Sequence, residues 1–373
     1  MKKIIFTLLT FSVLMLFSCA TDTTQSNDDA AKSYNITNIK YNQEHTDDVL
    51  DIYRTDDSVK KAVMFIHGGA WITVPGLEKS LGRLGMVQFK DFWLNNGYHV
   101  VNIDYRLINL NIQFNPANQS SPKTVDNSPN DIDYEDMLDD IKSAVKYIKD
   151  NADKYNIDAS KIVMYGYSAG AHLAELYSYK VTDSPIPVEL CVGRAGPADF
   201  NNKDFRKCEI LNTFTNAAVA AVAAYNLSDP SAISSLAIPM LKHFFNVPAD
   251  ASDDLLEDTM RCWIITNLLG IETDVTSDID AIADAPENQD KIQGASPIYH
   301  VTSSSPRTIL LHGKQDKLVP YSIAVSLHNK LTEYNVTHDF ITMPNSGHSL
   351  NDPQDSAELA KFNNKVLQAL QQL

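Results

Sequence analysis

Short apolar runs alternate with helical patterns from Lys40 onward, and this alternation constrains the fold more than any other feature of the chain. Such an alternation is typical of a mainly parallel sheet that is covered by helices. The runs are continuous rather than alternating, as expected for strands buried on both faces. We therefore predict an α/β fold, a mostly parallel central sheet with helices on both faces, with strands at 62–66, 98–105, 161–165, 188–192, 308–312 and 339–342.

A helix is predicted between roughly Asp131 and Asn151, because apolar residues recur there every three or four positions. Acidic residues gather at its start and lysines in its later turns, which complements the helix macrodipole. We interpret the acidic residues at 131–136 as the start of this helix rather than as a calcium site.

Two segments interrupt the alternation. Residues 107–130 are polar and contain three prolines, so they are predicted to form a long surface loop. Residues 201–293 have a helical composition, notably at 217–225 and 233–245, and show no convincing strand. An insertion of this kind between two strands is predicted to form a helical cap over one edge of the sheet.

The first residues are predicted to be an export signal. Lys2 and Lys3 precede a mostly apolar run at 4–17 that is too short to span a bilayer, so residues 1–18 are interpreted as a signal peptide. The run ends in Leu16-Phe17-Ser18-Cys19, which is similar to the cleavage box of bacterial lipoproteins. Cys19 is therefore the predicted lipidation site. Ordinary secretory cleavage after Ala20 and a retained anchor are the alternatives.

Residues 19–40 are predicted to be a lipidated, flexible tether, because residues 21–32 are nearly free of apolar side chains. Residues 41–373 would then form the folded domain. The resemblance to Gram-negative lipoproteins, together with the absence of Asp after Cys19, implies an exported protein anchored at the outer membrane, facing the periplasm or the cell surface.

Charge and cysteine usage exclude several kinds of partner. The formal net charge is −16 and no basic stripe offsets it, so nucleic-acid binding is not expected. No Cys/His cluster has zinc spacing, and neither a metal site nor a cofactor is predicted. Cys191 lies in an apolar run and is predicted to be a buried thiol, whereas Cys208 and Cys262 are a candidate disulfide pair.

Two glycine-containing motifs suggest nucleophilic chemistry. Residues 166–170, Gly-Tyr-Ser-Ala-Gly, follow a predicted strand and precede a good helix start, as the G-x-S-x-G elbow requires. Ser168 is therefore the candidate nucleophile. Residues 67–71, His-Gly-Gly-Ala-Trp, end an earlier strand, and their small side chains would let backbone N–H groups approach a developing oxyanion. Ala169, directly after Ser168, would supply another N–H group.

The order serine, acid, histidine along the chain identifies candidates for the remaining groups. Asp316 follows the strand at 308–312, and His348 follows the strand at 339–342, so both belong to the carboxyl end of the sheet. Asp199 is the chief rival for the acid. His312 and His172 are weaker rivals for the base, and His67 is predicted to brace the loop at 67–71.

Together these residues resemble the α/β-hydrolase superfamily, in particular the carboxylesterases related to hormone-sensitive lipase and the BD-FAE-like hydrolases. The resemblance covers about 45–370, with the loop and the cap as interruptions. It also rests on the motifs at 104–107, 157–162 and 295–297. It implies an α/β-hydrolase fold, an oxyanion hole made by Gly69, Ala70 and Ala169, and structural roles for Asp104 and Arg106.

The resulting hypothesis is a serine ester hydrolase with a Ser168-Asp316-His348 triad that acts on small-molecule or carbohydrate esters. By family analogy, acetyl or feruloyl groups on polysaccharides are the expected acyl groups. A serine peptidase of the prolyl-oligopeptidase type shares the elbow and the triad order, and a non-catalytic surface binding module that keeps the fold is a further alternative. The only expected contact with a membrane is the lipid on Cys19.

Overall fold

The computed structural model describes residues 35–45, 48–73, 81–109, 132–211, 238, 241–242, 245, 247–273 and 278–373. The predicted signal peptide, Cys19 and most of the predicted tether lie outside the described residues. So do residues 110–130 of the predicted loop, the predicted helical stretch at 217–225 and most of the stretch at 233–245. These predictions remain predictions from the sequence.

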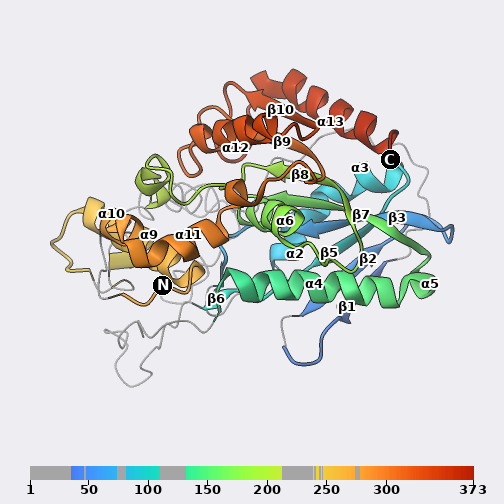
Figure 1. Ribbon diagram of the computed structural model, residues 1–373, viewed down its shortest axis with the longest axis horizontal. Helices are drawn as coiled ribbons and strands as arrows, with labels where there is room; N and C mark the ends of the chain where they lie inside the picture. Colours follow the sequence, from blue (N-terminus) through green and yellow to red (C-terminus); the bar gives the residue numbers. More distant parts are fainter. Residues whose placement is uncertain are drawn as a thin grey trace, which may run out of the picture.

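Eight strands form one sheet in the order β1-β2-β5-β3-β7-β8-β9-β10 (Figure 1). Only the β1–β2 and β2–β5 pairs are antiparallel, and the other neighbours in this sheet are parallel. The predicted mostly parallel central sheet is therefore confirmed. Its strands are β1 Ile36–Lys40, β2 Val49–Tyr53, β3 Lys60–Ile66, β5 His99–Ile103, β7 Ile157–Tyr167, β8 Val188–Arg194, β9 Arg307–Gly313 and β10 His338–Met343. The short strands β4 Ile72–Thr73 and β6 Ile108–Asn109 pair separately.

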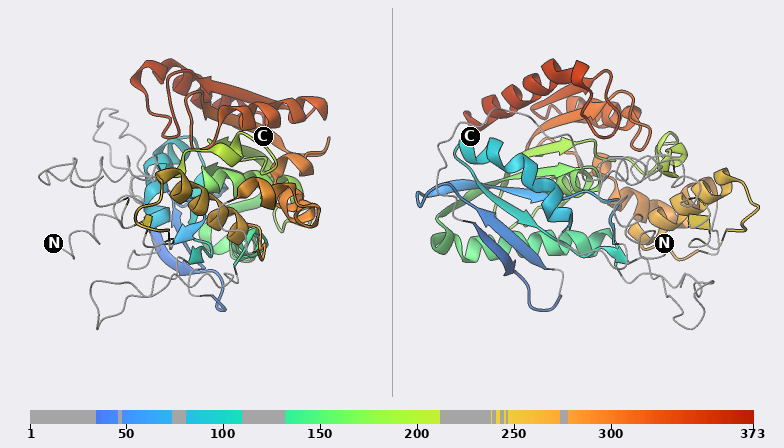
Figure 2. Two further views of the ribbon diagram at one scale, coloured as in Figure 1. Left: turned by 90° about the vertical axis from the view of Figure 1, so that its left-hand side faces the viewer. Right: turned by 180° about the vertical axis from the view of Figure 1, so that it is seen from behind.

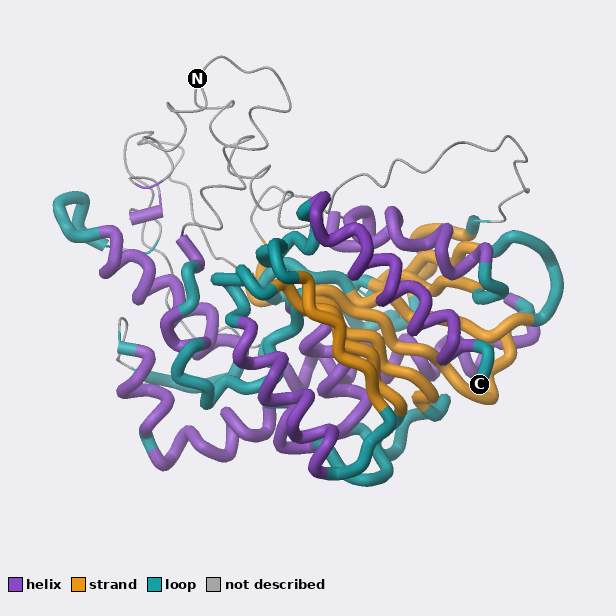
Figure 3. Tube along the Cα trace, turned by 90° about the horizontal axis from the view of Figure 1, so that it is seen from above, coloured by secondary structure: helices purple, strands orange, loops and turns teal. Residues whose placement is uncertain are grey.

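Helices cover both faces of this sheet, as Figure 3 shows. In β3, Met64 and Ile66 pack into one apolar cluster while Val63 and Phe65 pack into another, because successive side chains of a strand point to opposite faces. The first cluster includes α4 Tyr134–Asp150, α6 Ala169–Lys180 and α12 Tyr321–Glu333; the second includes α3 Lys90–Asn95 and α13 Ser356–Leu370. The other short helices, all before β7 in the chain, are α2 Leu81–Met86, η1 Val87–Phe89 and α5 Ala152–Tyr155.

The acidic residues before α4 form a helix start, as predicted. The Asp133 side chain accepts hydrogen bonds from the backbone N–H groups of Glu135 and Asp136, and the Asp136 carboxylate accepts one from the backbone N–H of Asp133. This reciprocal capping box satisfies donors that the helix itself leaves unpaired. The helix begins at Tyr134 rather than near Asp131.

Two predictions require correction. The tether was expected to reach residue 40, but Ile36–Lys40 form β1, an edge strand that pairs with β2. A polar edge strand has too few apolar positions to be recognised locally, and only its pairing partner defines it. Cys208 and Cys262 are not disulfide-bonded: both are buried free thiols, as is Cys191, which confirms the prediction for Cys191.

The described residues between β8 and β9 contain helices and no strand. They are η2 Phe205–Lys207, α9 Asp253–Leu268, α10 Ile279–Asp284, η3 Pro286–Asn288, α11 Gln289–Ala295 and η4 Pro297–His300. The helices α9, α10 and α11 gather at one end of the sheet, and in the left view of Figure 2 they lie in front of it. Among the described residues, no helix is both long enough and apolar enough to cross a bilayer.

Glu175 is a residue of α6 whose acidic side chain is buried in the core. Its side chain lies against β8, so close that a Cβ on Gly193 would meet Oε1 at 2.0 Å. Its Oε2 has no hydrogen-bond partner among the described residues. Burial raises the pKa of Glu175 to about 8. The folded protein therefore holds a proton on this group at neutral pH.

This burial predicts a pH-dependent loss of stability. As pH rises from 5 to 8, the unfolded chain completes the release of the Glu175 proton, whereas the folded chain begins to release it only near pH 8. The free energy of unfolding therefore falls as pH rises over this range, by about 3–4 kcal/mol. Glu175→Gln removes this contribution because the amide does not titrate. The test is the free energy of unfolding of both proteins in urea at the two pH values. Subtracting the pH dependence of the variant from that of the unsubstituted protein removes the contribution of every other titrating group. An identical pH dependence in both proteins would contradict the prediction.

Candidate active site

Ser168 occupies a sharp turn between β7 and α6. Its backbone has φ 57° and ψ −124°, a conformation that L-residues rarely adopt and that costs about 1–3 kcal/mol. The turn also requires a glycine at position 170, because a Cβ there would lie 2.0 Å from the carbonyl oxygen of Ile66. The Ser168 N–H donates to Arg194 O at 2.8 Å, which holds the turn onto β8. The motif thus forms a tight strand-to-helix elbow.

The side chains of Ser168, His348 and Asp316 form a hydrogen-bonded chain. His348 Nε2 lies 2.8 Å from Ser168 Oγ, and His348 Nδ1 lies 2.8 Å from Asp316 Oδ2. Asp316 follows β9 and His348 follows β10, so the carboxyl ends of neighbouring parallel strands bring them together. Because a carboxylate only accepts hydrogen bonds, Nδ1 carries the proton and Nε2 accepts the Ser168 hydroxyl.

Asp316 is buried and its carboxylate is held from several sides. Oδ1 accepts the backbone N–H groups of Leu318 at 3.0 Å and Val319 at 2.8 Å. Burial by itself would raise the pKa of Asp316, but the neighbouring His348 and hydrogen bonds from His312 and His348 outweigh burial and lower that pKa. Asp316 is therefore an ionised, fixed acceptor for His348.

The rival candidates have other partners. Asp199 accepts a hydrogen bond from the backbone N–H of Asn201 at 2.9 Å, and burial raises its pKa. His312 donates from Nε2 to Val319 O at 2.7 Å, with the same nitrogen 3.4 Å from Asp316 Oδ2. From the sequence, His312 is a weaker rival for the base and is expected to be a packing or hydrogen-bonding residue. His312 and Asp316 are four residues apart at the end of β9, and this spacing was the sequence signal that could have predicted their contact.

The loop at 67–71 lies directly against the elbow. Gly69, Ala70 and Trp71 have consecutive positive φ angles of 117°, 52° and 60°. A Cβ on Gly68 would come within 2.7 Å of Tyr167 O and 3.0 Å of Ser168 Cβ, so glycine is needed for this close approach. Ala70 and Ala169 line the same cavity as Ser168. Ala169 is the first residue of α6, where backbone N–H groups have no acceptor within the helix.

Buried aromatic and histidine side chains hold this loop. The His67 ring stacks on Tyr105 with centroids 4.5 Å apart, and the Tyr105 hydroxyl donates to His67 O at 2.7 Å. His67 Nδ1 also lies 2.7 Å from the Gly68 carbonyl oxygen. Burial lowers the pKa of His67 to about 4, which keeps the ring neutral. These contacts fix His67 at the start of the loop at 67–71, as expected for a residue that braces this loop.

A second brace joins the loop to α6. Trp71 Nε1–H donates to His172 Nδ1 at 3.1 Å, and His172 Nε2–H donates to Ala295 O at 2.7 Å. Burial lowers the pKa of His172 to about 4. Both ring nitrogens of this neutral histidine are therefore occupied away from Ser168. Sequence reasoning missed this bond, because residues 71 and 172 are far apart in the chain.

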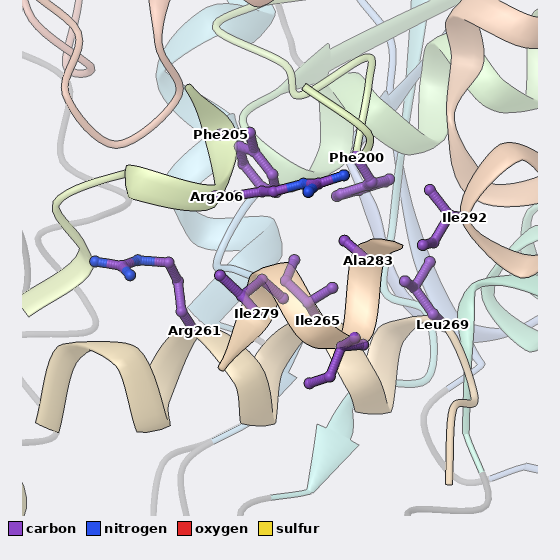
Figure 4. A pocket seen from close by; sticks show the side chains of 10 residues that line it. Phe200, Phe205, Arg206, Arg261, Ile265, Leu269, Ile279, Ala283 and Ile292 are labelled. Carbon is purple, nitrogen blue, oxygen red and sulfur yellow. The ribbon is translucent and has the colours of Figure 1, made fainter. Parts of the chain in front are cut away.

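A mostly apolar cavity of about 40 Å³ opens beside Ser168. Its lining includes Phe205 from η2, Ile264 and Ile265 from α9, and Val319. A smaller cavity of about 10 Å³ lies among α9, α10, α11 and η2 (Figure 4). Phe205, Arg261 and Ile265 line both cavities, so these side chains form the wall between them.

Two family models match parts of the chain. The model described as BD-FAE matches residues 128–237, a range that contains Ser168. The model of the prolyl oligopeptidase family matches residues 264–369, a range that contains Asp316 and His348. Each model covers less than half of the chain.

Several known proteins with similar sequences or structures are esterases. Esterase LipQ of Mycobacterium tuberculosis is 22% identical over 316 residues, which make up 83% of this chain and 56% of LipQ. This chain thus spans about half of the length of that relative. A truncated carbohydrate esterase from gut microbiota superposes with a TM-score of 0.56 and 20% identity, covering 94% of this chain and 99% of that one. A bifunctional GH43-CE protein of Bacteroides eggerthii gives a TM-score of 0.52 and 20% identity, over 88% of this chain and 38% of that one.

Proposed function

From the premise that this chain has the α/β-hydrolase fold, we propose that it is a serine carboxylic ester hydrolase. One observation carries the proposal: Ser168 Oγ, His348 and Asp316 lie in an unbroken chain of two 2.8 Å hydrogen bonds. That arrangement matches what a hydroxyl nucleophile requires, namely a base within reach and a carboxylate that orients the base.

In the proposed reaction, Ser168 Oγ attacks the ester carbonyl carbon as its proton passes to His348 Nε2. Backbone N–H groups of Gly69, Ala70 and Ala169 would stabilise the negative charge that develops on the carbonyl oxygen. The tetrahedral intermediate then expels the alcohol, which takes the proton from His348. A water molecule, deprotonated by His348, attacks the acyl-enzyme; the acid leaves and the proton returns to Ser168.

The cavity beside Ser168 supports a short acyl group as the substrate. The cavity is small, about 40 Å³, and its lining is mostly apolar, which suits a short acyl chain better than a bulky aromatic one. This size favours acetyl over feruloyl esters, the two groups expected from the family resemblance. The carbohydrate esterases among the structural neighbours support a polysaccharide as the alcohol part. Attachment to a membrane through Cys19 remains a proposal from the sequence.

Hydrolysis of p-nitrophenyl acetate, butyrate and octanoate tests the acyl preference. A kcat/KM that falls steeply with chain length is expected, because the wall at Phe205 closes the cavity. A preference for octanoate would contradict the short-acyl proposal. The match to the prolyl oligopeptidase family supports a peptidase as the second candidate, and faster cleavage of an aminoacyl-Pro amide than of any of these esters would favour it.

Opening the wall between the two cavities is expected to change the acyl preference. Phe205→Ala would join the cavities and let a longer chain enter, so the ratio of kcat/KM for octanoate to that for acetate rises about tenfold. Leu269→Ala is the matched control, since Leu269 lines only the inner cavity. The same rise in both variants would show that loosened packing, rather than the wall, controls the preference.

A further inference from the structure

A cluster of three possible metal ligands lies outside the candidate active site. His45 and Asp48 belong to the turn between β1 and β2, and Asp140 belongs to α4, which lies along this part of the sheet (Figure 1). Each of the three offers one ligand atom, and these atoms lie within 4.8 Å of one another. Asp48 and Asp140 are buried, whereas His45 is half-buried and so leaves a side open to solvent.

The Asp48 carboxylate is incompletely satisfied although its residue has no exposed surface. Its Oδ1 accepts a long hydrogen bond of 3.3 Å from the Tyr41 hydroxyl, and its Oδ2 has no hydrogen-bond partner among the described residues. Leaving such an oxygen unpaired is unfavourable.

Asp140, in contrast, is held firmly by Arg106. The Arg106 Nε and Nη2 atoms and its backbone N–H all contact the Asp140 carboxylate at 2.8–3.0 Å. The same guanidinium also pairs with Asp136 at 2.9 Å. Arg106 therefore contacts two carboxylates directly, and among the described residues no Lys or Arg side chain forms a salt bridge with Asp48. Hydrogen bonds of this kind orient a carboxylate that binds a metal.

We propose that His45, Asp48 and Asp140 bind one divalent cation of the zinc class. An imidazole nitrogen with two carboxylate oxygens is a donor set that suits Zn²⁺ better than Ca²⁺, which prefers oxygen donors alone. The cation would neutralise the buried carboxylates and tie the β1–β2 turn to α4. Zinc bonds are about 2.0–2.2 Å long, so the three ligand atoms would lie around one cation. No sequence motif predicted this site, because its ligands come from a turn and a distant helix.

The test is a zinc titration of the full chain after removal of metals with a chelator. Isothermal titration is expected to show one Zn²⁺ per chain, and zinc is expected to raise the melting temperature. Asp48→Asn keeps the shape of the side chain and removes the buried charge, so it should fold; it and His45→Ala are each expected to weaken zinc binding by about tenfold or more. Ester hydrolysis by each variant serves as a check of folding, because neither residue touches Ser168.

His328 and His338 provide the matched control. His328 Nδ1 lies 2.8 Å from His338 Nε2, so this pair is a rival zinc-binding place elsewhere on the chain. His338→Ala is expected to leave the binding unchanged. Zinc binding that disappears in His338→Ala, or that persists in both His45→Ala and Asp48→Asn, would overturn the proposal. Equally tight binding of Ca²⁺ would also overturn it, because His45 would then not be a ligand.

Discussion

Ser168→Ala is expected to reduce ester hydrolysis by about 10⁴-fold or more, leaving only the residual acceleration that substrate binding and the oxyanion loop supply. The substitution removes the hydroxyl oxygen that lies 2.8 Å from His348 Nε2. Without it no acyl-enzyme can form, whatever the oxyanion loop contributes. The fold should persist, since the backbone bond from residue 168 to Arg194 O does not involve the side chain.

The measurement is kcat/KM for p-nitrophenyl acetate with both proteins, together with circular dichroism to establish that the variant is folded. A fluorophosphonate should label the unsubstituted protein at Ser168 and leave the variant unlabelled. Undiminished hydrolysis by a folded variant would refute the mechanism. Absence of both labelling and hydrolysis in the unsubstituted protein would instead support the non-catalytic surface module.

Asp316→Asn is expected to lower kcat by about 10³–10⁴-fold while the protein remains folded. In the unsubstituted protein, the Asp316 carboxylate accepts a hydrogen bond from the protonated Nδ1 of His348, so Nε2 can receive the Ser168 proton. The asparagine carbonyl oxygen can still accept the backbone N–H groups of Leu318 and Val319 in the place of Oδ1. Its NH₂ group would then face His348 and favour the tautomer with the proton on Nε2, which cannot act as the base.

Asp199→Asn is the control for this prediction, because Asp199 was the rival acid and caps the backbone of Asn201. It is expected to change kcat by no more than a few-fold. Both variants should be assayed with the same ester, beside thermal unfolding curves. If Asp199→Asn loses activity and Asp316→Asn retains it, the acid has been assigned to the wrong residue.

Much of the candidate site could be predicted because its elements are signalled locally. The elbow around Ser168 needs a strand, a tight turn and a helix in immediate succession, and residues within about fifteen positions specify all three. The positions of Asp316 and His348 follow from strand ends, since parallel strands deliver their following loops to one edge of the sheet. The edge strand β1 was missed, and the sequence could not decide whether Cys208 and Cys262 pair, because both features depend on partners elsewhere in the chain.

The sequence by itself determined six strands of the main sheet, with ends within a few residues of the observed ones, since periodicity and turn chemistry act over a few neighbouring positions. Only the tertiary structure decided that Trp71 bonds His172, that Phe205 separates two cavities, and that Asp48 meets Asp140. These contacts join residues far apart in the chain, and their distances depend on how whole elements pack. Local sequence patterns restrict how the three-dimensional core can pack, but they do not specify one packing arrangement.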